Sequence, residues 1–406
     1  MKLEVVVTLS LAKNGIEIVC GSKNIEIIND VIFSALACDF LNDLSNLILS
    51  DKKLKYPDIV AFGFWLRKKN IKKYIQQYSD NFKRVGVGLA YHITPSNIPT
   101  NFAYSFIFGV VAGNSNVIKI SDLESFQSKY IIKKIRKLFK EKKYENFKKT
   151  NAFIKYKHDD EINSYLSSKC NARILWGGNN TINLFKKFKT AERTREINFP
   201  DRYSICLINA SYLKSLEKNS YNKLIQNFFN DTYLVDQNAC SSPRLVIWLK
   251  KKSLDLTKIK KSFWKRLGDK LVNYHLDASL DYKKFTILCE TLTKGNYKLI
   301  NNSINNKLYL LQKKSLEDLS VLSNLKLGIF FEYETSNIDE VFNLKDQSIQ
   351  TLSYIGFEKK YLRNIFEKNA CSSYDRIVPV GTVLDMDFSW DGYTIPYELS
   401  RIVDIK

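Results

Sequence analysis

The chain has 406 residues, of which 45% are hydrophobic and 13% aromatic, so it can bury a large core and is not a disordered binding chain. This length favours two domains or a bilobed enzyme. The net charge of +21 comes mainly from lysines spread over helix faces, and no nucleic-acid-binding motif accompanies it. We therefore expect a solvated basic surface and no nucleic-acid partner.

Seven scattered cysteines without paired spacing predict reduced thiols in a cytoplasmic protein. They stand at positions 20, 38, 170, 206, 240, 289 and 371. The three histidines, His92, His158 and His275, lie far apart in the sequence, so no metal site is predicted. The N-terminus lacks a signal-peptide pattern and no apolar run reaches membrane-spanning length, so neither secretion nor membrane insertion is expected.

The N-terminal part of the chain is predicted to form two short strands within residues 4–20, around the turn signal Lys13-Asn14-Gly15, followed by helices. From Arg84 onward, strand and helix patterns alternate. The expected strands are 85–92, 116–120, 152–155, 172–176 and 203–209. The expected helices are 101–111, 125–142, 159–167 and 181–189. This alternation predicts one doubly wound parallel sheet, whose ligands bind beyond the carboxyl ends of the strands.

A second α/β region follows, with a helix expected at 220–234 and strands at 245–249, 307–311 and 327–333. We expect three parts in the chain. They are an N-terminal segment with a Rossmann-like cofactor domain at 1–215, a mixed α/β catalytic domain at 216–375, and a tail at 376–406 that packs on the cofactor domain or serves oligomerisation.

Cys240 is a candidate nucleophile, because it follows a predicted helix and has small neighbours that would let a carbonyl approach. The pentapeptide Asn-Ala-Cys-Ser-Ser occurs at 238–242 and again at 369–373, so local sequence alone does not choose between Cys240 and Cys371. Only the first copy follows Asp-Gln and precedes Pro-Arg and an apolar strand. A buried structural thiol is the alternative reading for each cysteine.

Asn97 lies between two prolines in the segment Thr94-Pro95-Ser96-Asn97-Ile98-Pro99. The prolines fix an extended loop, which would hold the Asn97 amide ready to stabilise an oxyanion. An ordinary turn is the other reading of this segment.

Two further loops at the expected carboxyl edge carry groups that could bind a cofactor. Lys119, followed by Ser121 and Asp122, could bind ribose hydroxyls or a phosphate. Trp176-Gly177-Gly178 leads from a strand into a helix, where backbone amides could meet a pyrophosphate. The loop lacks the three-glycine dinucleotide fingerprint, and a surface lysine and a plain turn are the alternative readings.

Taken in order, these segments resemble the aldehyde dehydrogenase superfamily and, within it, the LuxC-type long-chain acyl-CoA reductases. The resemblance is good over 84–250 and looser over 375–401. The superfamily motifs are Pro-x-Asn at 95–97, Gly-Asn-x-x-x-x-Lys at 113–119 and Gln-x-x-Cys at 237–240. The LuxC-type branch is also similar at 199–202, 236–243 and 390–393.

The resemblance implies an aldehyde dehydrogenase-like α/β fold and a cysteine mechanism. Cys240 would attack an acyl-CoA or acyl-protein thioester, with the Asn97 amide and the Cys240 backbone N–H stabilising the oxyanion, and NADPH would reduce the acyl group to an aldehyde. The expected cofactor contacts are Thr94, Pro95, Ser96, Lys119, Ser121, Asp122, Trp176, Gly177 and Gly178. NADH stays open, because Asp122 lies close to where a 2′-phosphate would bind. The resemblance also implies a homo-oligomer and an acyl-protein synthetase or acyl-transferase partner.

Two superfamily motifs are missing. Where aldehyde-oxidising members carry Glu-Leu-Gly-Gly, this chain reads Phe199-Pro200-Asp201-Arg202, so no glutamate activates water and hydrolysis of an acyl-enzyme should be poor, as a reductase requires. The Glu-x-Phe-Gly-Pro cofactor contact is also absent, 330–333 being the nearest stretch. A non-redox cysteine acyltransferase and a basic binding protein on a degenerate enzyme fold remain the alternatives.

Overall fold

The computed structural model describes residues 7–13, 15–78, 82–122, 125–251, 254–295, 297–301 and 306–406. The chain forms two compact units. The first comprises Met1–Pro200 and Met386–Lys406, and the second comprises Asp201–Asp385. In the described part of the chain no helix is both long and apolar enough to span a membrane.

A six-stranded sheet organises the first unit, in the order β2-β7-β6-β5-β8-β9. Its strands are β2 (Glu17–Gly21), β5 (Leu89–Ile93), β6 (Ser115–Lys119), β7 (Asn151–Lys155), β8 (Ala172–Trp176) and β9 (Arg195–Phe199). All are parallel except β2, which runs antiparallel to β7. Since the central strands β5 and β8 are buried along their whole length, both faces of the sheet must be covered.

Helices cover one face of this sheet and a mixture of helices and short strands covers the other. On the first face lie α1 (Ala35–Leu49), α2 (Pro57–Trp65), α3 (Lys68–Gln77), α4 (Asn101–Val111) and α5 (Phe126–Leu138). On the second lie α7 (Asp160–Lys169), α8 (Asn179–Phe185), β1 (Thr8–Ser10) and β3 (Asn24–Glu26). The short helix α6 (Glu145–Thr150) leads into β7. Helix α4 is buried at every position, as its apolar sequence requires.

The C-terminal residues complete the first unit. They form β17 (Ser389–Trp390), β18 (Tyr393–Thr394), α15 (Ile395–Glu398) and β19 (Ser400–Val403). Strand β19 pairs antiparallel with β4 (Lys83–Gly86), and the buried side chains of Phe388, Trp390 and Leu399 join the first unit's core. The chain therefore returns to the first unit after making the second.

A seven-stranded sheet organises the second unit, in the order β12-β13-β14-β11-β10-β15-β16. Its strands are β10 (Tyr203–Asn209), β11 (Pro243–Leu249), β12 (Lys298–Asn301), β13 (Tyr309–Gln312), β14 (Ile329–Thr335), β15 (Ile349–Ile355) and β16 (Arg376–Pro379). Only β12 is antiparallel to its neighbour. The amino ends of the other six strands therefore share one edge and their carboxyl ends share the opposite edge.

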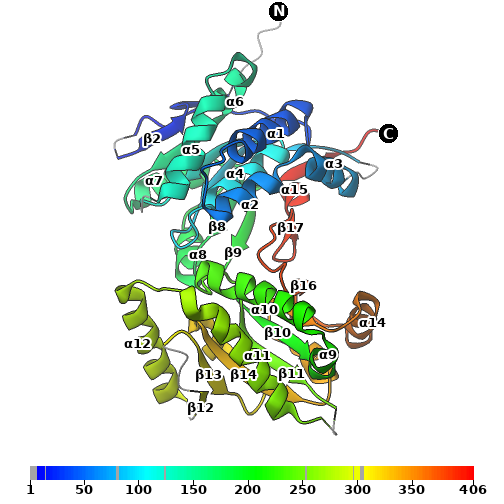
Figure 1. Ribbon diagram of the computed structural model, residues 1–406. Coiled ribbons are helices and arrows are strands. Elements are labelled where there is room, and N and C mark those ends of the chain that lie inside the picture. The colour runs from blue at the N-terminus through cyan, green and yellow to red at the C-terminus, as the bar shows by residue number, and fades with distance from the viewer. Residues whose placement is uncertain are drawn as a thin grey trace, which may run out of the picture. The chain divides into compact units, whose positions relative to one another are not determined.

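Helices flank the second sheet on both faces. On one face lie α9 (Ala210–Ser215), α10 (Lys218–Thr232) and α11 (Leu256–Lys270), the last two in front of the strands in Figure 1. On the other lie α12 (Ala278–Lys294), α13 (Asp339–Phe342) and α14 (Lys359–Asn369). The apolar residues of β10 alternate between the two clusters, with Ile205 and Leu207 on one face and Cys206 and Ile208 on the other.

Two sequence-based expectations about pairing are wrong. The strand expected at 203–209 is present as β10, but it belongs to the second sheet, and β9, which the pattern does not indicate, lies beside β8 instead. The N-terminal strands do not pair with each other, because β1 pairs with β3 and β2 with β7. Asn14 of the turn signal and Glu4 lie outside the described residues.

Candidate active site

Cys240 lies at the amino edge of the second sheet, in the loop between α10 and β11, and its side chain is partly exposed. The loop is tied to neighbouring strands. The Ser204 hydroxyl, at the start of β10, donates to the Cys240 carbonyl oxygen at 2.7 Å and accepts the Thr351 N–H of β15 at 3.1 Å. This arrangement fixes the backbone at Cys240 to the edge where three parallel strands begin.

The Gln237 side chain closes the loop that carries Cys240. Its amide nitrogen donates to the Pro243 carbonyl at 2.9 Å, and its amide oxygen accepts the Gly328 N–H at 2.9 Å. Asp236 and Gln237 both have left-handed backbone conformations, with φ of 50° and 56°. The Asp236 carboxylate accepts the Tyr274 hydroxyl at 2.6 Å, which holds this sharp turn. The Asp-Gln pair thus shapes the loop rather than reaching outward.

Asp231 of α10 supports the same loop and is not among the predicted site residues. The Ser242 hydroxyl donates to the Asp231 main-chain oxygen at 2.7 Å, and the Asp231 carboxylate accepts the Gly381 N–H at 2.6 Å. Burial raises the pKa of this carboxyl to about 7. One signal could have found it: the spacing of Tyr221, Ile225 and Phe228 places Asp231 on the buried face of the helix.

A buried positive charge interacts electrostatically with Cys240. The Arg244 guanidinium donates to the main-chain oxygens of Leu322 and Ser323 at 3.0 and 2.7 Å. Burial lowers the Arg244 pKa, while the nearby Cys240 and Asp201 side chains act to raise it. A guanidinium close to a thiol favours the thiolate, which is the nucleophilic form.

The second copy of the pentapeptide lies in a different environment. Cys371 is 9% exposed and packs with Leu362 and Ile365 of α14 in the core of the second unit. Burial raises the thiol pKa of four other cysteines, Cys20, Cys38, Cys170 and Cys206. Cys289 is exposed on α12. Among the cysteines, all of which the structure describes, only Cys240 combines partial exposure, a place at a sheet edge and an electrostatic interaction with a buried guanidinium.

The loop after β5 in the first unit brings several predicted cofactor residues together. Thr94, Pro95, Ser96 and Ser121 line one cavity of about 60 Å³ at the carboxyl ends of β5 and β6. The Thr94 hydroxyl donates to the Lys119 main-chain oxygen at 2.8 Å, which ties the two strand ends. Small-molecule sites have volumes of roughly 300–1,000 Å³, so a cavity of this size would take only a small part of a dinucleotide.

Lys119 ends β6, and the next two residues, Ile120 and Ser121, line this cavity. Its side chain is half-buried with the ammonium 4.8 Å from the centre of the Tyr156 ring. Burial lowers the Lys119 pKa and the carboxylate of exposed Asp122 opposes that effect. Hydroxyls and one ammonium at a carboxyl sheet edge are groups that fit the ribose and phosphate parts of a nicotinamide cofactor.

Trp176 lies at the carboxyl end of the neighbouring strand β8, but its indole belongs to the core. The ring stacks on Phe199 with centroids 3.6 Å apart, and Nε1 donates to the Ser105 hydroxyl at 3.0 Å. Gly177 has no room for a side chain, since a Cβ would come within 2.9 Å of Thr181, and Gly178 is the N-cap of α8. This loop therefore offers backbone groups rather than the Trp176 indole, and its contact with a cofactor stays a prediction.

His92, which the sequence analysis considered only as a metal ligand, anchors a buried hydrogen-bond chain beneath Trp176. The Asn116 amide nitrogen donates to the Asn114 main-chain oxygen and to Asn151 Oδ1, so the Asn116 amide oxygen faces His92 Nε2. In a neutral ring, His92 Nδ1 is then left to accept from the Ser105 hydroxyl, 2.8 Å away. His92 Nε2 then donates to Asn116 Oδ1 at 3.1 Å. Burial lowers the His92 pKa to about 4, consistent with this neutral tautomer.

The predicted site residues are divided between the two units. Asn97, exposed in the loop after β5, belongs to the first unit with the predicted cofactor residues, whereas Cys240 belongs to the second. The first unit thus gathers Thr94, Pro95, Ser96, Lys119 and Ser121 at one sheet edge. The joint action of Asn97 and Cys240 on one oxyanion stays a prediction, as does the assignment of cofactor binding and catalysis to separate domains.

Comparisons with known proteins give a family and a fold. A family model described as acyl-CoA reductase (LuxC) matches residues 65–402. No curated protein sequence matches the chain.

Among solved structures, lactaldehyde dehydrogenase from Escherichia coli is 11% identical, with a TM-score of 0.59 over 84% of this chain and 78% of that chain. An NAD-dependent benzaldehyde dehydrogenase from Corynebacterium glutamicum is 10% identical, with a TM-score of 0.61 over 91% and 85%. A mutant of aldehyde dehydrogenase C from Pseudomonas syringae, in complex with NAD⁺ and octanal, is 10% identical, with a TM-score of 0.59 over 85% and 76%. These likenesses confirm the expected aldehyde dehydrogenase-like α/β fold.

Proposed function

Because the chain belongs to the LuxC family of acyl-CoA reductases, we propose that it reduces an acyl thioester to an aldehyde while Cys240 carries the acyl group. Family and fold together support an oxidoreductase that acts on acyl or aldehyde groups. The observation that carries the cysteine assignment is the environment of Cys240, which is partly exposed at a sheet edge and interacts electrostatically with the buried Arg244 guanidinium.

The first chemical step is attack by the Cys240 thiolate on the thioester carbonyl. The Arg244 charge lowers the cost of forming the thiolate, and the Asn97 amide stabilises the negative oxygen of the tetrahedral intermediate. Expulsion of the coenzyme A thiolate, which takes up a proton from solvent, leaves an acyl group on the Cys240 sulfur. Ser204 and Gln237 contribute by holding the loop backbone, so that the sulfur keeps its position during attack.

The reductive step calls for a nicotinamide cofactor, for which Thr94, Ser96, Lys119 and Ser121 supply hydroxyls and an ammonium. When bound, the cofactor would supply the hydride that converts the acyl-enzyme to a thiohemiacetal on Cys240. Collapse of the thiohemiacetal then restores the thiol and releases the aldehyde. We assign NADPH as the cofactor, with NADH as the alternative because the Asp122 carboxylate would repel a 2′-phosphate.

Water must not compete for the acyl-enzyme. The segment Phe199-Pro200-Asp201-Arg202 contains no glutamate to activate a water molecule. Arg202 is instead engaged with the Asp375 carboxylate and the main-chain oxygens of Gln347 and Ile349. Through these contacts Arg202 holds strand ends together, which supports a structural role for this residue.

The proposal extends to the setting of the reaction. We propose a long-chain acyl substrate delivered as acyl-CoA or by an acyl-protein synthetase or acyl-transferase partner, in a cytoplasmic homo-oligomer. These assignments rest on the family alone.

Product analysis tests the redox part of the proposal. The chain is incubated with tetradecanoyl-CoA and either NADPH or NADH, and both nicotinamide absorbance and aldehyde are measured. We expect oxidation of the cofactor in step with aldehyde formation, and neither with Cys240→Ala. Transfer of the acyl group to an added amine or alcohol without a change in absorbance would instead favour a non-redox acyltransferase.

A further inference from the structure

A cavity of about 420 Å³ opens at the carboxyl edge of the second sheet. Cys240 precedes the first residue of β11, whereas Leu249 and Lys250, at the other end of that strand, line the cavity. A strand of 7 residues is roughly 20 Å long at about 3.3 Å per residue, so the cavity is separate from the proposed catalytic thiol. Its volume falls in the range of small-molecule sites.

The cavity lies where the connections of the sheet change sides. Strands β10 and β15 are parallel neighbours. From β10 the chain continues through α9 and α10, which pack on one face, and from β15 it continues through α14, which packs on the other face. Outgoing connections that part in this way leave a crevice between the two strand ends, and such crevices are the usual ligand sites of open parallel sheets.

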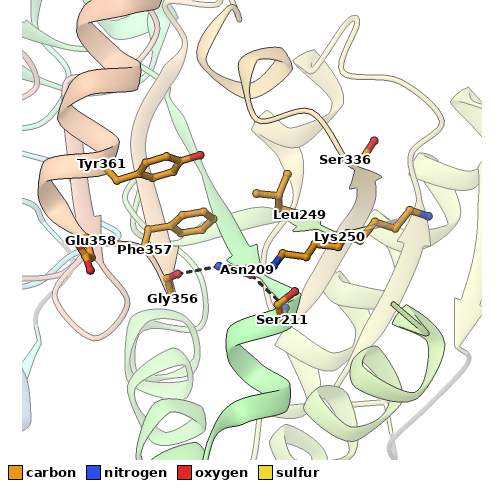
Figure 2. A pocket seen from close by; sticks show the side chains of 10 residues that line it. Asn209, Ser211, Leu249, Lys250, Ser336, Gly356, Phe357, Glu358 and Tyr361 are labelled. Atoms are coloured by element: carbon orange, nitrogen blue, oxygen red, sulfur yellow. Dashed lines mark hydrogen bonds between the residues drawn. The ribbon is translucent and has the colours of Figure 1, made fainter. Parts of the chain in front are cut away.

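A hydrogen-bonded frame holds the crevice open. The Asn209 amide nitrogen, at the end of β10, donates to the Gly356 main-chain oxygen at 3.0 Å, and the amide oxygen accepts the Ser211 N–H at 3.1 Å (Figure 2). Gly356 has φ of 78°, and a Cβ there would come within 2.4 Å of the Tyr212 side chain. Only glycine therefore fits this position without strain, and the floor of the crevice is fixed.

The cavity walls differ in chemistry. Phe357 and Tyr361 present parallel rings, 2° apart in plane and with centroids separated by 6.3 Å, and these rings face Leu249 across the cavity in Figure 2. Lys250 and Lys251 bring two ammonium groups, of which Lys250 also pairs with Glu334 at 3.0 Å. Glu358 is a further lining residue.

We propose that this cavity is a mononucleotide site. The Phe357 and Tyr361 rings would stack on the base, since every nucleobase offers a planar face to an aromatic side chain. Glu358 accepts hydrogen bonds from the ribose hydroxyls, as acidic residues do in dinucleotide sites. Lys250 and Lys251 bind the phosphate. A simple anion would leave the rings and Glu358 without a role, and a plain apolar molecule would leave the lysines without one.

The nucleotide could be free or could be the adenylate end of coenzyme A or of a nicotinamide dinucleotide. The three sources share the same base, ribose and phosphate, so binding is measured with AMP, coenzyme A and NADPH in separate arms. The source is the compound whose affinity falls most when the cavity is altered.

The test uses the full chain and calorimetric titration with AMP as the probe. Tyr361→Ala removes a ring that is 47% exposed, and Lys251→Glu reverses an exposed charge, so neither change should disturb the core. We expect AMP affinity to fall about tenfold with Tyr361→Ala, through lost stacking, and at least threefold with Lys251→Glu. Tyr282→Ala, which alters an exposed tyrosine on α12 of the same unit, is the matched control and should bind as the wild type does.

Photolabelling with 8-azido-AMP locates the site directly. We expect the label on peptides that contain Tyr361 or Lys250. Label confined to the first unit, or AMP affinities of Tyr361→Ala and Lys251→Glu equal to that of the wild type, would overturn the proposal. AMP binding and acyl transfer to Cys240 are measured separately, so failure of the nucleotide site and failure of the proposed function are distinguishable.

Discussion

The side chains of two buried residues, Ser204 and Gln237, hold the Cys240 loop in place through hydrogen bonds. Ser204 joins the Cys240 carbonyl to the Thr351 N–H, and Gln237 joins Pro243 to Gly328. Both partners of Ser204 are distant from it in the sequence. The identical pentapeptide at 369–373 is held by other partners, since the Ser373 hydroxyl donates to the Leu344 main-chain oxygen and accepts the Asp346 N–H. Equal local sequences are therefore held in different environments.

Replacing Ser204 tests whether this frame matters to the reaction. Ser204→Ala leaves the Cys240 carbonyl and the Thr351 N–H without their partner, and each unsatisfied buried group costs about 1–3 kcal/mol of unfolding free energy. We expect lower stability in urea unfolding and slower acylation of Cys240 in rapid-quench measurements.

Ser353→Ala is the matched control for that variant. The Ser353 hydroxyl donates to the Ile205 carbonyl at 3.2 Å, deeper between the same two strands. Ser353→Ala should lower the free energy of unfolding without slowing the acylation of Cys240. Equal acylation rates in Ser204→Ala and the wild type would show that the frame has no part in catalysis.

His92 should make the first unit less stable in acid. Its pKa is lowered to about 4 by burial, from 6.5, so between these values the unfolded chain binds a proton that the folded chain does not. Unfolding is therefore favoured as pH falls through this window, by up to about 3 kcal/mol.

The measurement is the unfolding free energy at pH 7 and pH 4.5 for the wild type and His92→Gln. We expect the wild type to lose more stability between these pH values than the variant does. His158→Gln, which changes an exposed histidine, is the control and should behave as the wild type. The same pH dependence in all three proteins would show that His92 is already protonated when folded or is not desolvated.

At the scale of elements, the local sequence pattern predicts the type and the bounds of a helix or strand well where its apolar run is long. Helix α4 and strands β8 and β10 have the bounds that the sequence indicates, because each run ends at polar or glycine residues. The sheet to which a strand belongs does not follow from its own residues. Strand β10 illustrates this, since it pairs with β11 and β15, whose residues lie up to about 150 positions away.

Other elements leave a weak local signal. In β9 only Ile197 and Phe199 are apolar and buried, so its sequence looks like a loop, although it completes the first sheet beside β8. The expected strand at 85–92 is two strands, β4 and β5, because Gly88, with φ of 126°, interrupts it. The structure assigns β4 to a separate pairing with β19.

Gly109 tests how closely α4 must approach the first sheet. A Cβ at this position would lie 1.7 Å from Asn116 Oδ1 and 3.1 Å from His92 Nε2. In an isolated helix, alanine would be favoured over glycine by about 1 kcal/mol, but here the contact should prevail and destabilise the unit by about 1–3 kcal/mol.

The prediction is checked by a double-mutant cycle of Gly109→Ala and Asn116→Ala in chemical unfolding. We expect Gly109→Ala to lower the free energy of unfolding much less in the Asn116→Ala background, because the contact with the Asn116 side chain is absent there. Equal costs in both backgrounds would mean that α4 moves away from the sheet freely.

At the scale of the molecule, the chain builds one unit, then the other, and then returns to the first. The family and the fold class were predictable, because several motifs occur in the expected order. The supporting roles of Ser204, Asp231 and His92 were not predictable, since each residue acts through partners that are distant in the sequence. Asn97 and Cys240 were predicted from motifs, but a sequence cannot show how residues of two units act together.

The returning tail is expected to stabilise the first unit specifically. Phe388 packs its ring against Trp65, Tyr74 and Phe108, with centroids 5.0, 4.8 and 5.7 Å away. Phe388→Ala should cost about 3–5 kcal/mol. In hydrogen exchange, protection should fall in peptides of the first unit and stay unchanged in those of the second. Phe366→Ala, on the surface of α14, is the control. A uniform loss of protection across the chain would contradict two separately stabilised units.

The identity of the acyl-carrying sulfur is the claim on which the functional account depends. Full-length wild type, Cys240→Ala and Cys371→Ala are each incubated with radiolabelled acyl-CoA without cofactor, and the label is located by peptide mapping. The account predicts label on Cys240 in the wild type and in Cys371→Ala, and no label in Cys240→Ala. Label that persists in Cys240→Ala and disappears in Cys371→Ala would contradict it.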